Sequence, residues 1–137
     1  MNDHNSFKAD IHIRWRDLDT IGHVNHSDYF TYFEDARAAL LDAHGLDFND
    51  PEVFFILVHV NCDYLKPVAY KCKIAVYIQC VEIGDKSFKF AYTVADRADA
   101  SVVYAKGESV QVCMNPKTGK SAQVSEKFKK VLETYRD

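Results

Sequence analysis

The sequence predicts an α+β fold in which one long helix covers an antiparallel sheet. The expected elements follow the order strand, long helix, four strands and short helix, and such a run of strands indicates antiparallel pairing. Most of the strands alternate apolar and polar residues, which is typical of a sheet with one buried face. A helix of about 18 residues spans about 27 Å, and five strands span about 24 Å. One helix can therefore lie across the whole sheet.

Length and composition indicate a single domain that spans residues 1–137. The chain is 47% apolar and 27% charged, which is enough to bury a core without disulfides or metals. A net charge of −3 gives no electrostatic reason to bind nucleic acid or an anionic membrane. The longest apolar run, residues 53–60, is too short to span a bilayer, and the first ten residues lack the apolar core of a signal peptide. We therefore expect a cytoplasmic protein without membrane insertion.

The first strand and the helix after it are the clearest local predictions. Residues 7–15 alternate as a half-buried strand, and residues 16–26 form a loop. A helix is expected from Ser27 or Asp28, both good N-cap residues, to about residue 44. Apolar residues recur at helical spacing, and charged residues mark the other side, where Glu34 and Arg37 are expected to form an ion pair.

Four further strands and a short helix complete the expected fold. Residues 53–65 are apolar on both faces in their first half, which predicts a central strand covered on both sides. Gly107 is a candidate β-bulge. The other elements are expected at residues 71–83, 88–95, 101–114 and 123–135. The four cysteines show no C-x-x-C pair and are expected as reduced, small apolar residues: Cys62, Cys72, Cys80 and Cys113.

Chemistry-bearing residues concentrate in the loop before the long helix. Twelve residues there contain three aspartates, two histidines and an asparagine: Asp17, Asp19, His23, Asn25, His26 and Asp28. A carboxylate beside the positive end of a helix suits a reaction in which an oxyanion forms close to a base. The same residues lack the spacing of H-E-x-x-H or paired-cysteine sites, so no metal is expected.

The motif from Arg14 to Arg37 carries a family resemblance. Arg14-Trp15-x-Asp17-Leu18-Asp19-x-x-Gly22-His23-Val24-Asn25-His26-x-x-Tyr29-Phe30, followed by Tyr32-Phe33-Glu34-x-Ala36-Arg37, resembles the signature of hot-dog-fold acyl-CoA thioesterases of the 4-hydroxybenzoyl-CoA thioesterase-like family. The segment Asp63-Tyr64-Leu65-Lys66-Pro67 resembles the family's second-strand ending. The resemblance implies a curved five-stranded antiparallel sheet wrapped around one long central helix. It also implies homodimers or homotetramers with active sites at the subunit interface, and no cofactor.

Six residues are candidates for the site, and the resemblance assigns the catalytic roles among them. It places the catalytic carboxylate, as nucleophile or general base, on Asp19. The oxyanion donor falls on a backbone N–H at or next to His26, whose side chain either assists catalysis or packs the helix start. The candidate substrate-binding residues are His23, Asn25, Tyr29 and Glu34, although His23 and Asn25 also fit a structural role in the loop, Tyr29 also fits the core, and Glu34 also fits the ion pair with Arg37. Asp17 is expected to pair with Arg14 or Arg16.

The function that follows is hydrolysis of an acyl-CoA thioester to a carboxylic acid and CoA. An aspartate is ordinarily ionised at pH 7, and free N–H groups at a helix start can stabilise the developing oxyanion. The alternatives are a hot-dog dehydratase or hydratase, and a non-catalytic acyl-CoA or acyl-carrier binding protein. Cations for the CoA phosphates could come from any of six lysines: Lys66, Lys71, Lys73, Lys86, Lys89 and Lys106. In the turn after Pro67 this chain departs from the family, with Tyr70-Lys71 where relatives carry Gly-Asp.

Overall fold

The fold consists of one curved antiparallel sheet with two helices packed on its inner face. The computed structural model describes residues 5–47 and 49–136. The outermost positions of the predicted domain, 1–4 and 137, lie outside the described residues. The elements are β1 (Phe7–Ile11), a single 3₁₀ turn (Trp15–Asp17), α1 (Asp28–Ala43), β2 (Phe55–Tyr64), β3 (Ile74–Ile83), β4 (Ser87–Asp96), β5 (Val103–Cys113) and α2 (Glu126–Thr134). This arrangement confirms the predicted α+β class and the predicted order of elements.

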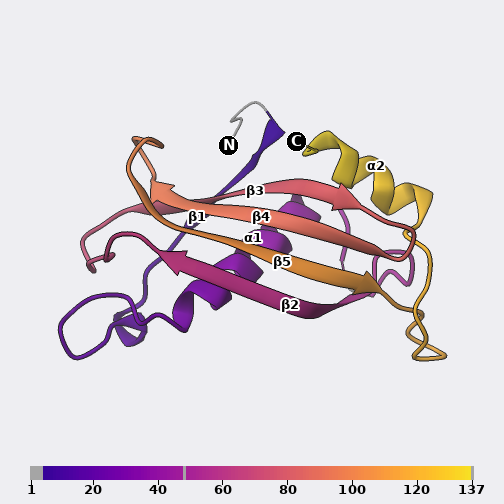
Figure 1. The fold of residues 1–137 in the computed structure, drawn as a ribbon, viewed down its shortest axis with the longest axis horizontal. Coiled ribbons are helices and arrows are strands. Elements are labelled where there is room, and N and C mark those ends of the chain that lie inside the picture. The colour runs from indigo at the N-terminus through magenta and orange to yellow at the C-terminus, as the bar shows by residue number, and fades with distance from the viewer. Residues whose placement is uncertain (1–4, 48, 137) are drawn as a thin grey trace.

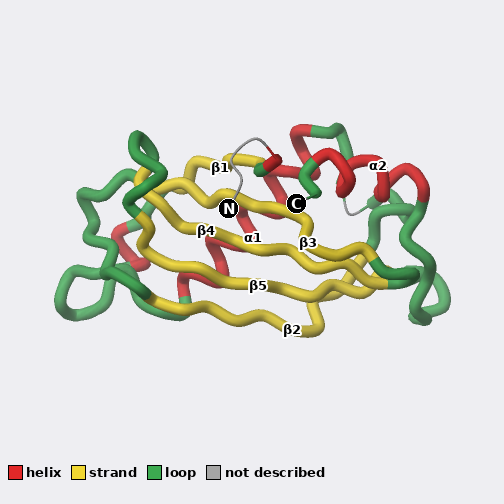
Figure 2. The backbone as a smooth tube through the Cα atoms, turned by 45° about the horizontal axis from the view of Figure 1, so that its top comes forward, coloured by secondary structure: helices red, strands yellow, loops and turns green. Residues whose placement is uncertain are grey.

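The sheet runs in the order β1-β3-β4-β5-β2, so the first two strands in the chain form its two edges (Figure 1). Every neighbouring pair is antiparallel. The helix α1 crosses behind the sheet, and the loops that connect the elements gather at its two ends (Figure 2). Among the described residues, no helix has the length and apolar character needed to cross a membrane.

The core lies between the sheet and one face of α1. Phe33 is fully buried and stacks on Tyr92 of β4, with ring centroids 4.2 Å apart. Burial of one such aromatic side chain contributes about 2–3 kcal/mol to stability. At the far end of the sheet, α2 inserts Phe128 against Phe88 at 5.0 Å and so closes the core there.

Gly107 is not the bulge that the sequence suggested. It keeps regular register with Cys62 of β2 and Tyr92 of β4. A Cβ atom at this position would lie 2.4 Å from the carbonyl oxygen of Asn61 and 2.7 Å from the Phe33 ring. Glycine is required because it lets the α1 aromatic approach the sheet.

The first strand is shorter than predicted. β1 ends at Ile11, four residues before the expected end, although Ile13 is still buried. The chain turns because the buried Asp17 carboxylate accepts hydrogen bonds from the main-chain N–H and the guanidinium of Arg14, at 3.0 and 3.1 Å. These bonds close a 3₁₀ turn that redirects the chain into the loop.

The prediction that β2 is a central strand is wrong, because β2 is an edge strand paired only with β5. Its apolar side chains Ile56, Leu57 and Val58 are 43–53% exposed. A strand with both faces apolar is covered in a finished assembly, but a single sequence does not reveal whether its own sheet or another chain provides the cover.

The prediction that Arg37 forms an ion pair with Glu34 is also wrong. Arg37 is on the buried side of α1, only 7% exposed, and its Nη1 donates to the Tyr92 hydroxyl at 3.0 Å. Tyr92 in turn contacts Ser109 at 2.5 Å, and Ser109 bonds Gln111, so a buried polar chain runs under the helix. The helical spacing placed Arg37 near the boundary of the apolar face, where an amphipathic side chain can turn to either side.

Candidate active site

Asp17 holds the loop before α1 in place through hydrogen bonds and an ion pair. Its carboxylate is 1% exposed, pairs with Arg14 at 3.1 Å and accepts the Tyr32 hydroxyl of α1 at 2.8 Å. Its main-chain oxygen accepts the Asn25 N–H at 2.7 Å, which ties the two ends of the loop together. Burial alone would raise the pKa of Asp17, but these donors outweigh it and hold the pKa below its ordinary value. The expected pairing with Arg14 is confirmed.

Asp19 has one fixed carboxylate oxygen and one free one. Its Oδ1 accepts the main-chain N–H groups of Ile21 at 3.0 Å and His23 at 3.1 Å. Its own N–H donates to the His23 oxygen at 2.7 Å, and Gly22 closes the turn at a φ of +80°, which favours glycine. Among the described residues, Oδ2 accepts no hydrogen bond. The carboxylate is therefore held in place while one oxygen is left to react.

The start of α1 lies beside this carboxylate. Asp28 is the first helical residue, and Ser27 is the N-cap without a side-chain capping bond. Asn25 instead organises the approach, because its Oδ1 accepts from both the N–H and the hydroxyl of Ser27 at 3.1 Å. Within the described residues, the N–H groups of His26 and Tyr29 have no protein acceptor, so the helix start keeps free donors.

Tyr64, at the end of β2, joins the sheet to this helix start. Its hydroxyl donates to the His26 main-chain oxygen at 2.7 Å, and its ring meets the Tyr29 ring edge-to-face at 5.0 Å. The loop and the segment after β2 are also joined by the Val24 N–H, which donates to the Val68 oxygen at 2.8 Å. Two segments about 40 residues apart in sequence thus form one wall.

Between these segments is a cleft of about 320 Å³, and Asp19 is part of its lining. It is lined by residues of the loop, the first turn of α1 and the end of β2: Asp19, His23, Val24, His26, Tyr29, Tyr64, Leu65, Lys66 and Pro67. Burial raises the pKa of Tyr29 to about 12, so its hydroxyl stays protonated at neutral pH. Lys66 is the cation of this lining, and its Nζ lies 5.9 Å from the centre of the Tyr104 ring.

The structure brings four of the six predicted site residues to the cleft. Asp19, His23, His26 and Tyr29 line it, whereas Asn25 shapes the turn before the helix and Glu34 lies exposed on α1 outside the lining. The sequence interpretation did not place Tyr64 and Leu65 in the site. The Asp63–Pro67 motif was the available signal, but alone it does not show which element its residues contact.

Other reactive groups in the described part of the chain do not form a competing centre. No group of three or more histidine, cysteine or carboxylate side chains has a metal-binding arrangement there. The four cysteines are unpaired. Burial raises the pKa of the Cys62, Cys80 and Cys113 thiols to about 11, which keeps them protonated and weakly nucleophilic.

Comparison with known proteins supports the assignment of this fold. The family model described as the thioesterase-like superfamily matches residues 13–132. The chain belongs to this superfamily. The recognised resemblance and the hot-dog fold that it implied are thus confirmed.

Among relatives of this superfamily member, a putative esterase of Aquifex aeolicus is 30% identical over 91% of this chain and 94% of its own. A 1,4-dihydroxy-2-naphthoyl-CoA hydrolase of Rippkaea orientalis is 29% identical over 89% and 91%. A crystal structure of a Pseudomonas aeruginosa protein superposes with a TM-score of 0.89 at 24% identity, covering 98% of this chain and 94% of that one. That likeness concerns the fold.

Proposed function

We propose that this protein is a thioester hydrolase that converts an acyl-CoA to a carboxylic acid and CoA. The observation that carries the proposal is Asp19, which lines a cleft at the start of α1 and whose carboxylate has one oxygen held by main-chain N–H groups and the other free. The superfamily and the names of the relatives, among them a CoA-thioester hydrolase, support the same reaction class.

Asp19 acts on the thioester carbonyl through its free oxygen. As a general base, it takes a proton from water while the water oxygen bonds to the carbonyl carbon. As a nucleophile, it bonds to that carbon itself and forms an anhydride that water then hydrolyses. In both routes the C–S bond breaks, CoA leaves as a thiolate and takes up a proton, and the acid is released.

The carbonyl oxygen gains negative charge in either route, and the helix start stabilises it. The free N–H groups of His26 and Tyr29 lie at the positive end of α1, and both residues line the same cleft as Asp19. His26 also lines the cleft, so its side chain can assist the departure of the sulfur. The hydrogen bond from Tyr64 to the His26 oxygen holds this donor segment in position.

The decisive test is the Asp19→Asn variant, measured by thiol release from acyl-CoA substrates of several chain lengths. Loss of the base lowers kcat/KM by about 100-fold or more. Asp42→Asn, an exposed substitution near the other end of α1, serves as the matched control and keeps wild-type activity. The assignment is wrong if the folded, normally assembled Asp19→Asn enzyme hydrolyses at close to the wild-type rate.

The proposed functional unit is a homo-oligomer in which two copies of β2 pair edge to edge. β2 offers ten residues of one-sided pairing and exposes Ile56, Leu57 and Val58. A long apolar edge of this kind associates readily with another strand. Tyr64 and Leu65 continue from β2 into the cleft wall, so the second copy would lie next to the site.

A further inference from the structure

A cationic hollow lies next to the candidate active site, at the same end of the sheet. It has a volume of about 310 Å³ between the segment after β1 and the segment before β3. The described residues that line it are Ile11, His12, Ile13, Tyr70, Lys71, Cys72, Lys73 and Arg97. Three of them are lysine or arginine and none is a carboxylate, although the whole chain carries a net charge of −3. Such a local excess of cations attracts anions.

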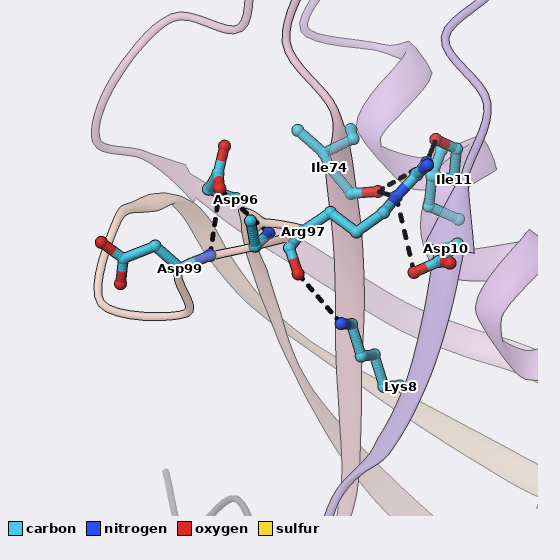
Figure 3. Close-up of polar contacts among 8 residues, drawn as sticks. Lys8, Asp10, Ile11, Ile74, Asp96, Arg97 and Asp99 are labelled. Carbon is cyan, nitrogen blue, oxygen red and sulfur yellow. Dashed lines mark hydrogen bonds and ion pairs between the residues drawn. The ribbon is translucent and has the colours of Figure 1, made fainter.

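The cations of this hollow differ in whether a hydrogen bond or an ion pair already engages them. Arg97 is fixed, because its guanidinium donates to the Ile11 oxygen at 2.9 Å and pairs with Asp10 at 3.5 Å (Figure 3). Its neighbour Asp96 accepts the N–H groups of Ala98 and Asp99 at 3.0 Å, so that carboxylate is engaged in its own turn. Lys71 and Lys73 are exposed, and neither ammonium has an ion-pair partner among the described residues.

Two exposed aromatic rings adjoin the hollow. Trp15 is 75% exposed and meets Tyr70 edge-to-face, with ring centroids 5.5 Å apart. Tyr70 belongs to the hollow, and Trp15 belongs to the loop that carries Asp19. An exposed aromatic ring can stack with a flat heterocycle.

One continuous segment links the two sites. Residues 64–67 line the cleft, residues 70–73 line the hollow, and His23 pairs with Ala69 between them. A ligand held at Asp19 can therefore extend along this segment, past the aromatic pair, to the lysines. The ligand that such a path fits has a reactive thioester at one end, and an aromatic base with phosphates at the other.

We infer that the Trp15–Tyr70 pair and the adjoining Lys71–Lys73 hollow bind the phosphorylated adenosine end of the CoA substrate. This inference rests on the proposed thioesterase function, because it assigns the other end of the same substrate. The adenine stacks on Trp15, and the phosphates lie against Lys71 and Lys73. Of the six candidate lysines, these two are selected because they share one hollow that adjoins the cleft and whose lining contains no carboxylate. The neighbouring hollow, which they also line, contains Asp96, and that carboxylate is engaged by the N–H groups of its own turn.

Binding of free CoA tests the inference without hydrolysis. Trp15 is the only tryptophan in the sequence, so its fluorescence reports directly on stacking. CoA quenches it saturably, dephospho-CoA binds more weakly, and pantetheine leaves the emission unchanged.

In a Lys71→Ala/Lys73→Ala variant the Kd for CoA rises about tenfold. A Lys86→Ala/Lys120→Ala control, at the opposite end of the sheet, binds like wild type. Absence of quenching, or unchanged binding by the Lys71/Lys73 variant, overturns the inference.

Kinetics with two substrates separate this inference from the thioesterase function. The Lys71→Ala/Lys73→Ala enzyme loses about tenfold in kcat/KM on acyl-CoA and retains the wild-type value on the matching acyl-pantetheine, which lacks the nucleotide. An equal loss on both substrates overturns the inference, as does a loss confined to acyl-carrier-protein thioesters. If wild type hydrolyses neither small thioester, the proposed function fails, and the CoA titration alone decides whether the nucleotide site exists.

Discussion

At the scale of single residues, the two aspartates of Asp17-Leu18-Asp19 have opposite environments. Asp17 is buried and satisfied by Arg14 and Tyr32. Asp19, two positions later, lines the cleft, and one of its carboxylate oxygens accepts no hydrogen bond among the described residues. Asp17 ends a 3₁₀ turn and Leu18 after it is extended, so the chain changes conformation between the two aspartates and their side chains do not share one environment. The first carboxylate positions the loop, and the second is available for chemistry.

The Asp17→Asn variant is expected to lose about 2 kcal/mol of unfolding free energy at pH 7. The substitution removes the charge that pairs with Arg14 and weakens the acceptor for the Tyr32 hydroxyl, and hydrogen bonds to charged groups contribute on this scale. Urea unfolding measures the difference, with Asp42→Asn as an exposed control. An equally stable Asp17→Asn protein would show that the loop does not depend on this carboxylate.

The pH dependence of this loss has a definite sign. The folded pKa of Asp17 is lowered, so its contribution to stability is complete above the unfolded value of about 3.9. It disappears as the pH falls through the lower folded pKa. The stability gap between wild type and Asp17→Asn should therefore be constant from pH 7 to about pH 5 and shrink below pH 4.

At the scale of elements, the sequence predicted the helix well and the environment of β2 badly. The N-cap residues and the apolar period placed α1 within a residue or two of its observed bounds, because both signals are local. The apolar character of β2 is equally local, but its meaning depends on what lies beyond the strand. Gly107 shows the same limit: a glycine was noticed, but its contact with Phe33 spans more than 70 residues.

The exposed edge of β2 yields a prediction about assembly. A Val58→Lys substitution places a charge on the edge and should dissociate the oligomer, because charged edges oppose strand pairing. Light scattering after size exclusion measures the mass, and thiol release measures activity, which should fall with it. Gln123→Lys adds the same charge at an exposed site before α2 and should change neither. A wild-type protein that is monomeric at assay concentration and fully active would refute the proposal.

At the scale of the whole molecule, the site exists because the fold brings distant segments to one end of the sheet. The loop before α1 and the segment after β2 meet there, and the turn after β4 lies at the same end of the sheet (Figures 1 and 2). The sequence identified the first of these segments, since its motif combines carboxylates, histidines and a helix start in one short run. It did not identify the cleft wall formed by Tyr64 and Leu65, because their role arises only when β2 pairs with β5 and reaches the helix.

The contact between these segments can be tested by removing one oxygen atom. Tyr64→Phe keeps the ring against Tyr29 but loses the hydrogen bond to the His26 main-chain oxygen, so the helix start is held less firmly relative to Asp19. We expect kcat to fall about 3–10-fold, which corresponds to the roughly 1 kcal/mol of one neutral hydrogen bond, with a smaller change in KM. Tyr77→Phe, on the outer face of the sheet beneath Lys8, makes the same chemical change away from the site and should leave both constants unaltered. Equal kinetics for the two variants would mean that the position of the oxyanion donors is set within the loop and α1 alone, without support from the sheet.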